Sequence, residues 1–203
     1  NQRAWRRETR EFARSPVLLA MAAIPDVDAA TFADALEGMA APLVAVLDPR
    51  GKVLAGRGGF VVGQELGAMP GLQSALQTGV EDHVWMLPDG PALVAVAPLA
   101  QGGELLGALV RGERIDSALA KRLGAIGASD VMLVHDGTSL GQRWRKQPKG
   151  EVDLDALRGV RFADLPPEGK ALELRVDGEP RLGVAMRLRD DGGVAFLSHD
   201  LSH

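Results

Sequence analysis

The sequence predicts an α/β fold of the α+β type. We expect a long N-terminal helix followed by two tandem copies of one module, each with a mainly antiparallel five-stranded sheet. The chain has 203 residues, which is enough for two small domains. Its 46% hydrophobic and 25% charged residues are ordinary globular usage. The same order of periodic segments and turns occurs twice along the chain, which indicates an internal repeat.

The N-terminal segment has helical periodicity. Within residues 4–24, Trp5, Phe12 and Leu19 recur at the spacing of one helical face among Arg and Glu side chains. Pro16 predicts a break or a kink inside this segment, because proline removes a backbone donor from a helix interior.

A second helix is expected after Asp28, a residue type that favours helix N-caps. From there the pattern changes to short apolar runs bounded by Gly, Asp and Pro, which predicts strands and turns. The expected strands of the first module are residues 43–47, 52–55, 83–87, 92–99 and 104–111, with a Gly-rich loop at residues 56–67 and a short helix at residues 69–78.

The same order begins again after residue 115. The apolar run 43–48 aligns with residues 131–136 at an offset of 88, and the Asp-Gly turn at residues 89–90 aligns with that at residues 177–178 at the same offset. The expected elements of the second module are helices at residues 116–126 and 154–157, strands at residues 131–135, 172–176, 181–188 and 194–198, and a loop after residue 137. We therefore divide the chain into a helical stalk (residues 1–40), a first module (41–115) and a second module (116–203).

Composition excludes several kinds of function. The absence of cysteine excludes disulfides, thiolate nucleophiles and iron–sulfur clusters. A net charge of -4 argues against a nucleic-acid partner. The longest apolar run, residues 17–24, is far shorter than the ~20 residues of a membrane-spanning helix. None of the four histidines has the spacing of a zinc site or of an HExxH motif. His199 and His203 are four residues apart and could bind a metal if helical, but we interpret them as the surface of an exit helix. We expect no catalytic residue, no metal and no cofactor.

The strand at residues 83–87 is a candidate for ligand binding. Alternation places His83 and Trp85 on one face of it, and bulky residues on both faces predict that the strand is covered on both sides. An indole beside an imidazole suits a small pocket with one polar end. The alternative is structural: Trp85 fills the core, and His83 forms a hydrogen bond with a loop.

Two arginines are the candidate partners for an anionic ligand. Arg57 opens the Gly-rich loop, and Arg111 ends the last strand of the first module. A guanidinium group holds a carboxylate through two parallel hydrogen bonds, so a small carboxylate is the expected ligand. For Arg111 the alternative is an ion pair with Glu113 or Asp116 at the module junction.

Several stretches look like one known family: residues 12–18, 42–55, 105–116, 119–123, 130–134 and 193–200. A PAS-like module has this order of elements: a helix, a hairpin, a short helix and a three-stranded meander. Two such modules behind a leading helix resemble the double Cache (PDC) sensor domain of bacterial transmembrane receptors. The resemblance implies a periplasmic domain held between two membrane helices. In that family the membrane-distal module binds a small ligand, and the membrane-proximal module leads to a cytoplasmic output domain.

We therefore expect the extracytoplasmic, periplasmic sensing domain of an inner-membrane protein. Its first, membrane-distal module would bind a small metabolite, and its second, membrane-proximal module would relay the change to a histidine kinase, or else to a cyclase or chemoreceptor. A homodimer along the leading helix is expected, because the face of Trp5, Phe12 and Leu19 would otherwise be exposed. The alternatives are a ligand-free ectodomain that dimerises or meets a protein partner, and a cytosolic regulator or enzyme with a PAS- or GAF-like fold.

Overall fold

The computed structural model describes residues 2–24, 28–127, 130–135, 138–146, 148–150, 152–153, 164–166, 169–189 and 192–199. The chain divides into two compact units, Asn1–Arg114 and Ile115–His203. The first unit includes the N-terminal helices together with the first sheet. No helix among the described residues is both long enough and apolar enough to cross a membrane.

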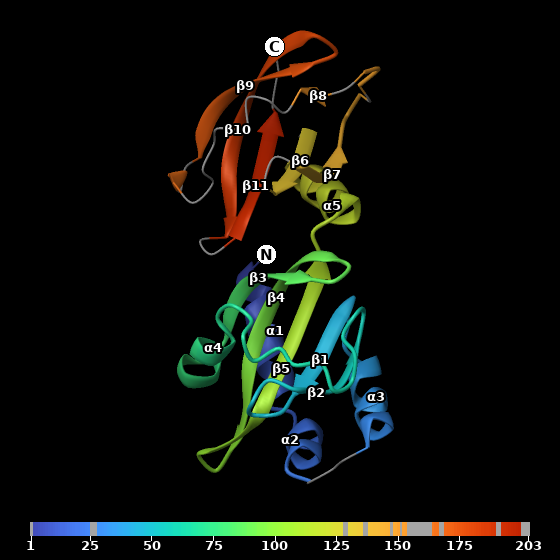
Figure 1. The fold of residues 1–203 in the computed structure, drawn as a ribbon, viewed down its shortest axis with the longest axis vertical. Helices are drawn as coiled ribbons and strands as arrows, with labels where there is room; N and C mark the ends of the chain where they lie inside the picture. Colours follow the sequence, from blue (N-terminus) through green and yellow to red (C-terminus); the bar gives the residue numbers. More distant parts are fainter. Residues whose placement is uncertain are drawn as a thin grey trace. The chain divides into compact units, whose positions relative to one another are not determined.

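The first unit is a five-stranded antiparallel sheet with helices on both faces (Figure 1). Its elements are α1 (Gln2–Ala13), α2 (Pro16–Ala22), α3 (Ala29–Glu37), β1 (Leu43–Leu47), β2 (Val53–Arg57), α4 (Leu72–Thr78), β3 (Glu81–Leu87), β4 (Gly90–Gln101) and β5 (Glu104–Arg114). The strand order is β2-β1-β5-β4-β3. The predicted hairpin and three-stranded meander are therefore confirmed, and β3 lies at one edge of the sheet.

The interior strand β1 is buried along its whole length because both of its faces are covered. Alternate side chains enter two different core clusters, as the period of a strand requires. Leu43, Ala45 and Leu47 pack on the side of α4 and the Gly-rich loop, whereas Val44 and Val46 pack on the side of α1, α2 and α3. The sheet thus has an α4 face and an α1 face.

The turn between β4 and β5 illustrates how the glycines shape the meander. Gln101 pairs with Glu104, which leaves two residues in the connection. Gly102 and Gly103 have φ angles of 61° and 89°, and a two-residue hairpin turn of this kind needs positive φ at both central positions.

The N-terminal helices pack on the α1 face. The predicted break falls between α1 and α2, and Pro16 begins α2, where its missing backbone donor costs no helical hydrogen bond. Trp5, Phe12 and Leu19 pack against the buried cluster of this face. These side chains are partly buried on their own sheet, which weakens the reason for expecting a homodimer along this helix, and the homodimer itself stays a prediction.

The second unit repeats the topology of the first. Its elements are α5 (Ser117–Gly127), β6 (Asp130–His135), β7 (Thr138–Arg143), β8 (Val152–Asp153), β9 (Lys170–Val176), β10 (Glu179–Arg189) and β11 (Gly192–His199). The strand order β7-β6-β11-β10-β9-β8 matches that of the first sheet element by element, with β8 added at one edge. This match confirms the internal repeat at the level of strand order.

Four expectations for individual elements either need correction or concern residues that the structure does not describe. The second sheet has six strands rather than five, because β8 is added at one edge, and β7 occupies a segment where we expected a loop. His199 is the last residue of β11, so its assignment to an exit helix is wrong. Ile126 is 82% exposed, although the spacing of Leu119, Leu123 and Ile126 predicts that all three lie on one apolar side of the helix expected at residues 116–126. The helix expected at residues 154–157 lies outside the described residues.

Candidate functional site

Trp85 belongs to the core of the α4 face. Its side chain is fully buried, and the indole N–H donates a hydrogen bond to the backbone oxygen of Pro70 at 2.9 Å. Phe60 from the Gly-rich loop meets the indole edge-to-face, with ring centroids 6.5 Å apart. Leu72 of α4 lies in the same cluster. The indole therefore both fills this layer and anchors the segment that leads into α4.

His83 lies two residues away on the same strand. Its Nε2 atom is 3.2 Å from Oε2 of Glu81, and its side chain is 12% exposed. Gly71 fits against the imidazole, since a methyl group at Gly71 would overlap the ring. The carboxylate of Glu81 also accepts hydrogen bonds from the hydroxyl groups of Thr78 (2.6 Å) and Ser74 (2.8 Å).

These contacts stabilise the ionised form of Glu81. The Thr78 and Ser74 hydroxyl groups are the main causes that hold the pKa of Glu81 below its ordinary value of 4.5, and His83 adds a smaller effect. Partial burial of the carboxylate opposes the shift. The polar cluster beside α4 is therefore tied together by internal hydrogen bonds.

The strand that carries His83 and Trp85 is covered on both faces over only part of its length. On its other face, Val84 is buried but Met86 is 52% exposed. The expectation of full cover is therefore wrong at Met86. The reason is that β3 is an edge strand, and α1 passes only part of it.

Arg57 holds a chain connection together. It is the last residue of β2, and its guanidinium group donates hydrogen bonds to the backbone oxygens of Met39 and, at 3.1 Å, Ala41. Both acceptors lie between α3 and β1. The side chain thus fixes the path of the chain from the N-terminal helices into β1.

Arg111 lies on the α1 face of the sheet. Its side chain is 1% exposed, and its guanidinium carbon is 4.7 Å from the ring centroid of Trp5 and 4.8 Å from that of Phe12. Its ion-pair partner is Glu8 of α1, at 3.5 Å, rather than the residues at the module junction that we considered. Burial lowers the pKa of Arg111, and the nearby carboxylate partly offsets that shift.

The four predicted ligand-binding residues therefore do not converge. His83 and Trp85 share the α4 face near the β3 edge. Arg111 lies on the opposite face, and Arg57 lies on β2 at the other edge of the sheet. Each of the four makes a contact within the first unit.

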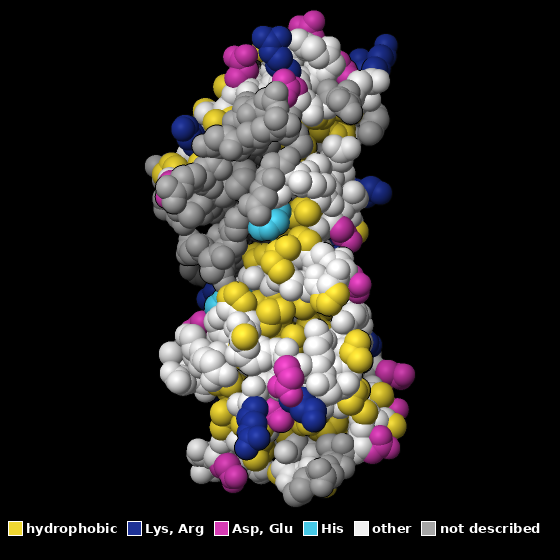
Figure 2. Space-filling model, viewed as in Figure 1, with side chains coloured by type: hydrophobic (Ala, Val, Ile, Leu, Met, Phe, Trp, Pro, Cys, Tyr) yellow, Lys and Arg dark blue, Asp and Glu magenta, His cyan; other side chains and the backbone are white. Residues whose placement is uncertain are grey.

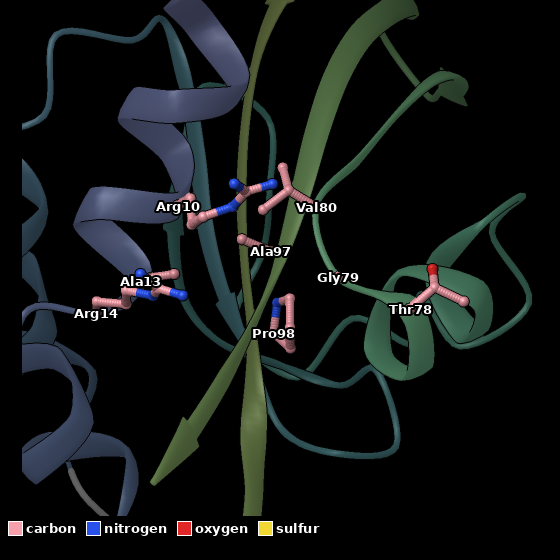
Figure 3. A pocket seen from close by; sticks show the side chains of 8 residues that line it. All are labelled: Arg10, Ala13, Arg14, Thr78, Gly79, Val80, Ala97 and Pro98. Atoms are coloured by element: carbon pink, nitrogen blue, oxygen red, sulfur yellow. The ribbon is translucent and has the colours of Figure 1, made fainter. Parts of the chain in front are cut away.

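A cavity of about 270 Å³ lies elsewhere in the first unit, where α1 passes β4 and the start of β3 (Figure 3). The residues that line it are Arg10, Ala13, Arg14, Thr78, Gly79, Val80, Ala97 and Pro98. Figure 3 shows the side chains of Arg10 and Arg14 reaching from α1 toward β4 and the Gly79–Val80 segment. Our reading of the sequence missed this site. The signal for it was two arginines at i, i+4 on a helix whose other face is apolar.

Solved structures of several receptors share this fold. The periplasmic domain of Vibrio cholerae LuxQ matches 98% of this chain and 92% of its own length, with a TM-score of 0.59 and 17% identity. The sensor domain of the V. cholerae histidine kinase DctB matches 96% of this chain and 88% of its own, with a TM-score of 0.60 and 12% identity. The ligand-binding domain of the Pseudomonas fluorescens chemoreceptor CtaA, solved in complex with L-serine, matches 100% and 90%, with a TM-score of 0.58 and 16% identity.

No family model and no curated protein matches the sequence. At these low identities the likeness concerns the fold alone. Within that limit it confirms the predicted resemblance: the chain has the double Cache (PDC) fold of periplasmic sensor domains, with two PAS-like units in tandem.

Proposed function

We propose that this chain is the extracytoplasmic sensing domain of a membrane signalling protein. The observation that carries the proposal is the extent of the structural match. Both units, in order, correspond to the sensor or ligand-binding domains of LuxQ, DctB and CtaA over at least 96% of the chain. In this proposal the first unit is membrane-distal and binds a small metabolite. The second unit is membrane-proximal and relays the change to a cytoplasmic histidine kinase.

Two ionic contacts of α1 support a role for this helix in signalling. Arg6 donates to the buried carboxylate of Asp82 on β3, and Arg111 on β5 pairs with Glu8. Charged groups therefore hold helix α1 to two strands, β3 and β5, which lie on either side of β4. A ligand that binds beside α1 would favour one position of the helix over others, which is a shift of population between existing states.

We propose no catalytic role for this chain. The histidine and the acidic residues of β3 are held in structural contacts: Glu81 by two hydroxyl groups and His83, and Asp82 by Arg6. We also propose no nucleic-acid partner. The net charge is -4, and positive and negative side chains are interspersed on the face of the first unit seen in Figure 2.

One observation favours a second candidate function, an ectodomain that binds a protein partner instead of a metabolite. The α4 face of the first unit is packed with large buried side chains, among them Phe60, Leu72 and Trp85. A ligand could enter that layer only if the core opened. Val61 and Val62 of the Gly-rich loop are 66% and 56% exposed and would suit contact with a protein.

A thermal-shift screen of the purified chain against amino acids, small carboxylates and purines separates the two candidates. A true ligand at about 100 times its dissociation constant stabilises the folded state by about 2.7 kcal/mol, which gives a clear rise in the unfolding temperature. A panel without any such rise would contradict metabolite sensing and favour the protein-binding ectodomain.

A reporter fusion tests the placement outside the cytoplasm. Alkaline phosphatase inserted at the exposed Gly102–Gly103 turn of the full-length protein is active only when that turn is exported. We expect an active fusion in intact cells. An inactive fusion, with the protein present in the membrane fraction, would overturn the extracytoplasmic placement.

A further inference from the structure

We propose that the cavity between α1 and the edge of the first sheet binds a small aliphatic carboxylate, with Arg10 and Arg14 as its anion-binding residues. This inference rests on the proposed sensing function and assigns it a site and a ligand class. The site lies on the α1 face of the sheet, away from the packed α4 face.

The first argument is the uncompensated charge of the two arginines. Arg10 lies in the last turn of α1 and Arg14 directly follows its last residue, so two like charges stand four residues apart at the end of the helix, a spacing at which like charges repel. Their neighbours on the same helix are compensated, Arg6 by Asp82 and Arg7 by Glu11. The backbones of Arg10 and Arg14 are joined, because the Arg14 N–H donates to the Arg10 oxygen at 3.2 Å, but among the described residues neither guanidinium group makes a hydrogen bond or an ion pair. A bound anion would remove the repulsion between them.

The second argument is the apolar lining that faces these charges. Ala13 of α1 and Ala97 of β4 are buried, and Val80 and Pro98 complete the apolar part of the cavity. Strand β3 pairs with β4 only as far as Glu81 and Val96, so Ala97 and Pro98 lie just past the end of the edge strand. The cavity therefore exists because β3 begins only at Glu81 and does not extend alongside Ala97 and Pro98.

The third argument is the open backbone segment opposite the arginines. Gly79 has a φ of 114°, and no atom lies within 4 Å of the position that a Cβ would occupy. This glycine turns the chain from α4 into β3 and leaves free space beside the turn. A side chain there would be strained, so the space is kept open by the backbone conformation itself.

Size and polarity together select the ligand class. A volume of about 270 Å³ lies just below the usual range of small-molecule pockets. Guanidinium groups bind carboxylates in a bidentate manner, and the apolar lining suits a short hydrocarbon chain. A short aliphatic mono- or dicarboxylate satisfies both halves of the cavity, whereas inorganic phosphate satisfies only the charged half.

Isothermal titration calorimetry of the full 203-residue chain tests this assignment. Succinate, butyrate, the neutral analogue succinamide and inorganic phosphate are titrated to about 10 mM, which saturates a site of millimolar affinity. We expect binding of succinate or butyrate, no binding of succinamide, and weaker binding at high salt. Arg10→Gln and Arg14→Gln should each weaken binding about tenfold or more, and the double variant should abolish it.

Arg7→Gln is the matched control, because Arg7 lies on the same helix, is exposed and does not line the cavity. It should bind as the unaltered chain does. The thermal midpoints of all variants should stay close to that of the unaltered chain, since Arg10 and Arg14 are exposed.

Three results would overturn the proposal: no binding of either carboxylate, carboxylate affinity that survives the double substitution, or phosphate binding in preference to both carboxylates. If a different metabolite bound the double variant with the same affinity as the unaltered chain, this result would contradict the proposed site but would agree with the sensing function. An inactive reporter fusion would contradict the placement of the domain without affecting the calorimetry.

Discussion

Arg111 and Glu81 show how polar residues stabilise the first unit. Arg111 is buried between two aromatic rings and an acidic partner, all on α1. Glu81 gathers two hydroxyl groups and His83 around one carboxylate beside α4. Both residues join a helix to the sheet, on opposite faces.

Replacing Arg111 should loosen α1. Arg111→Ala removes the cation from the faces of Trp5 and Phe12 and leaves a cavity in their place. We expect a loss of about 2–4 kcal/mol in the free energy of unfolding. Urea unfolding measures the loss, with the exposed Arg7→Ala as the control, which should cost less than about 0.5 kcal/mol. An Arg111→Ala protein as stable as the control would show that these contacts contribute little.

Glu81 should make stability depend on pH. Folding lowers its pKa below the ordinary value of 4.5, so the ionised carboxylate stabilises the folded state. This stabilisation is fully present above pH 4.5 and is lost as the pH falls through the lower pKa of the folded state. Glu81→Gln should therefore be destabilising near about pH 7, and the difference from the unaltered chain should shrink near about pH 3. A difference that stays constant over this range would refute the linkage.

Element boundaries depend on capping and on the position of each strand in its sheet. The Asp28 side chain accepts a hydrogen bond from the backbone of Ala30 at 3.0 Å and so begins α3 where the sequence indicated. Strand β7 was missed because it is an edge strand with few buried side chains and little apolar alternation. Interior strands such as β1 were predictable because burial on both faces requires a continuous apolar run.

Loss of the α3 cap should have a measurable cost. Asp28→Ala removes the acceptor for an otherwise unpaired backbone N–H, and we expect a loss of about 1 kcal/mol in the free energy of unfolding. Asp34→Ala, an exposed change in the interior of the same helix, should be neutral or slightly stabilising, because alanine has the higher helix propensity. Equal effects of the two changes would mean that the Asp28 contact does not stabilise the helix.

The whole molecule consists of two units with the same strand order, and this part was predictable from the sequence. The repeat shows in the turns and apolar runs, which are local signals. The candidate site was not predictable, because sequence alone does not assign an arginine to one face of a sheet. Arg111 could be placed on its strand, but its contact with α1 joins segments about a hundred residues apart. The cavity likewise depends on where α1 crosses β4, which no local pattern encodes.

The first unit should fold by itself. Residues 1–114 contain a complete sheet and both of its core layers, and their number is typical of an independent domain. We expect a fragment of these residues to unfold cooperatively by circular dichroism and to keep the ligand affinity of the full chain. A fragment without cooperative unfolding would show that the second unit is needed to complete the first.

The most direct measurement of the central claim is an NMR titration of the isotopically labelled chain with succinate. The account predicts that the largest backbone amide shifts cluster around the cavity, at Arg10, Ala13, Arg14, Gly79, Val80 and Ala97. The amides of Trp85 and of the second unit should move little. Shifts centred on the α4 face or in the second unit, or spectra unchanged at saturating succinate, would contradict the account.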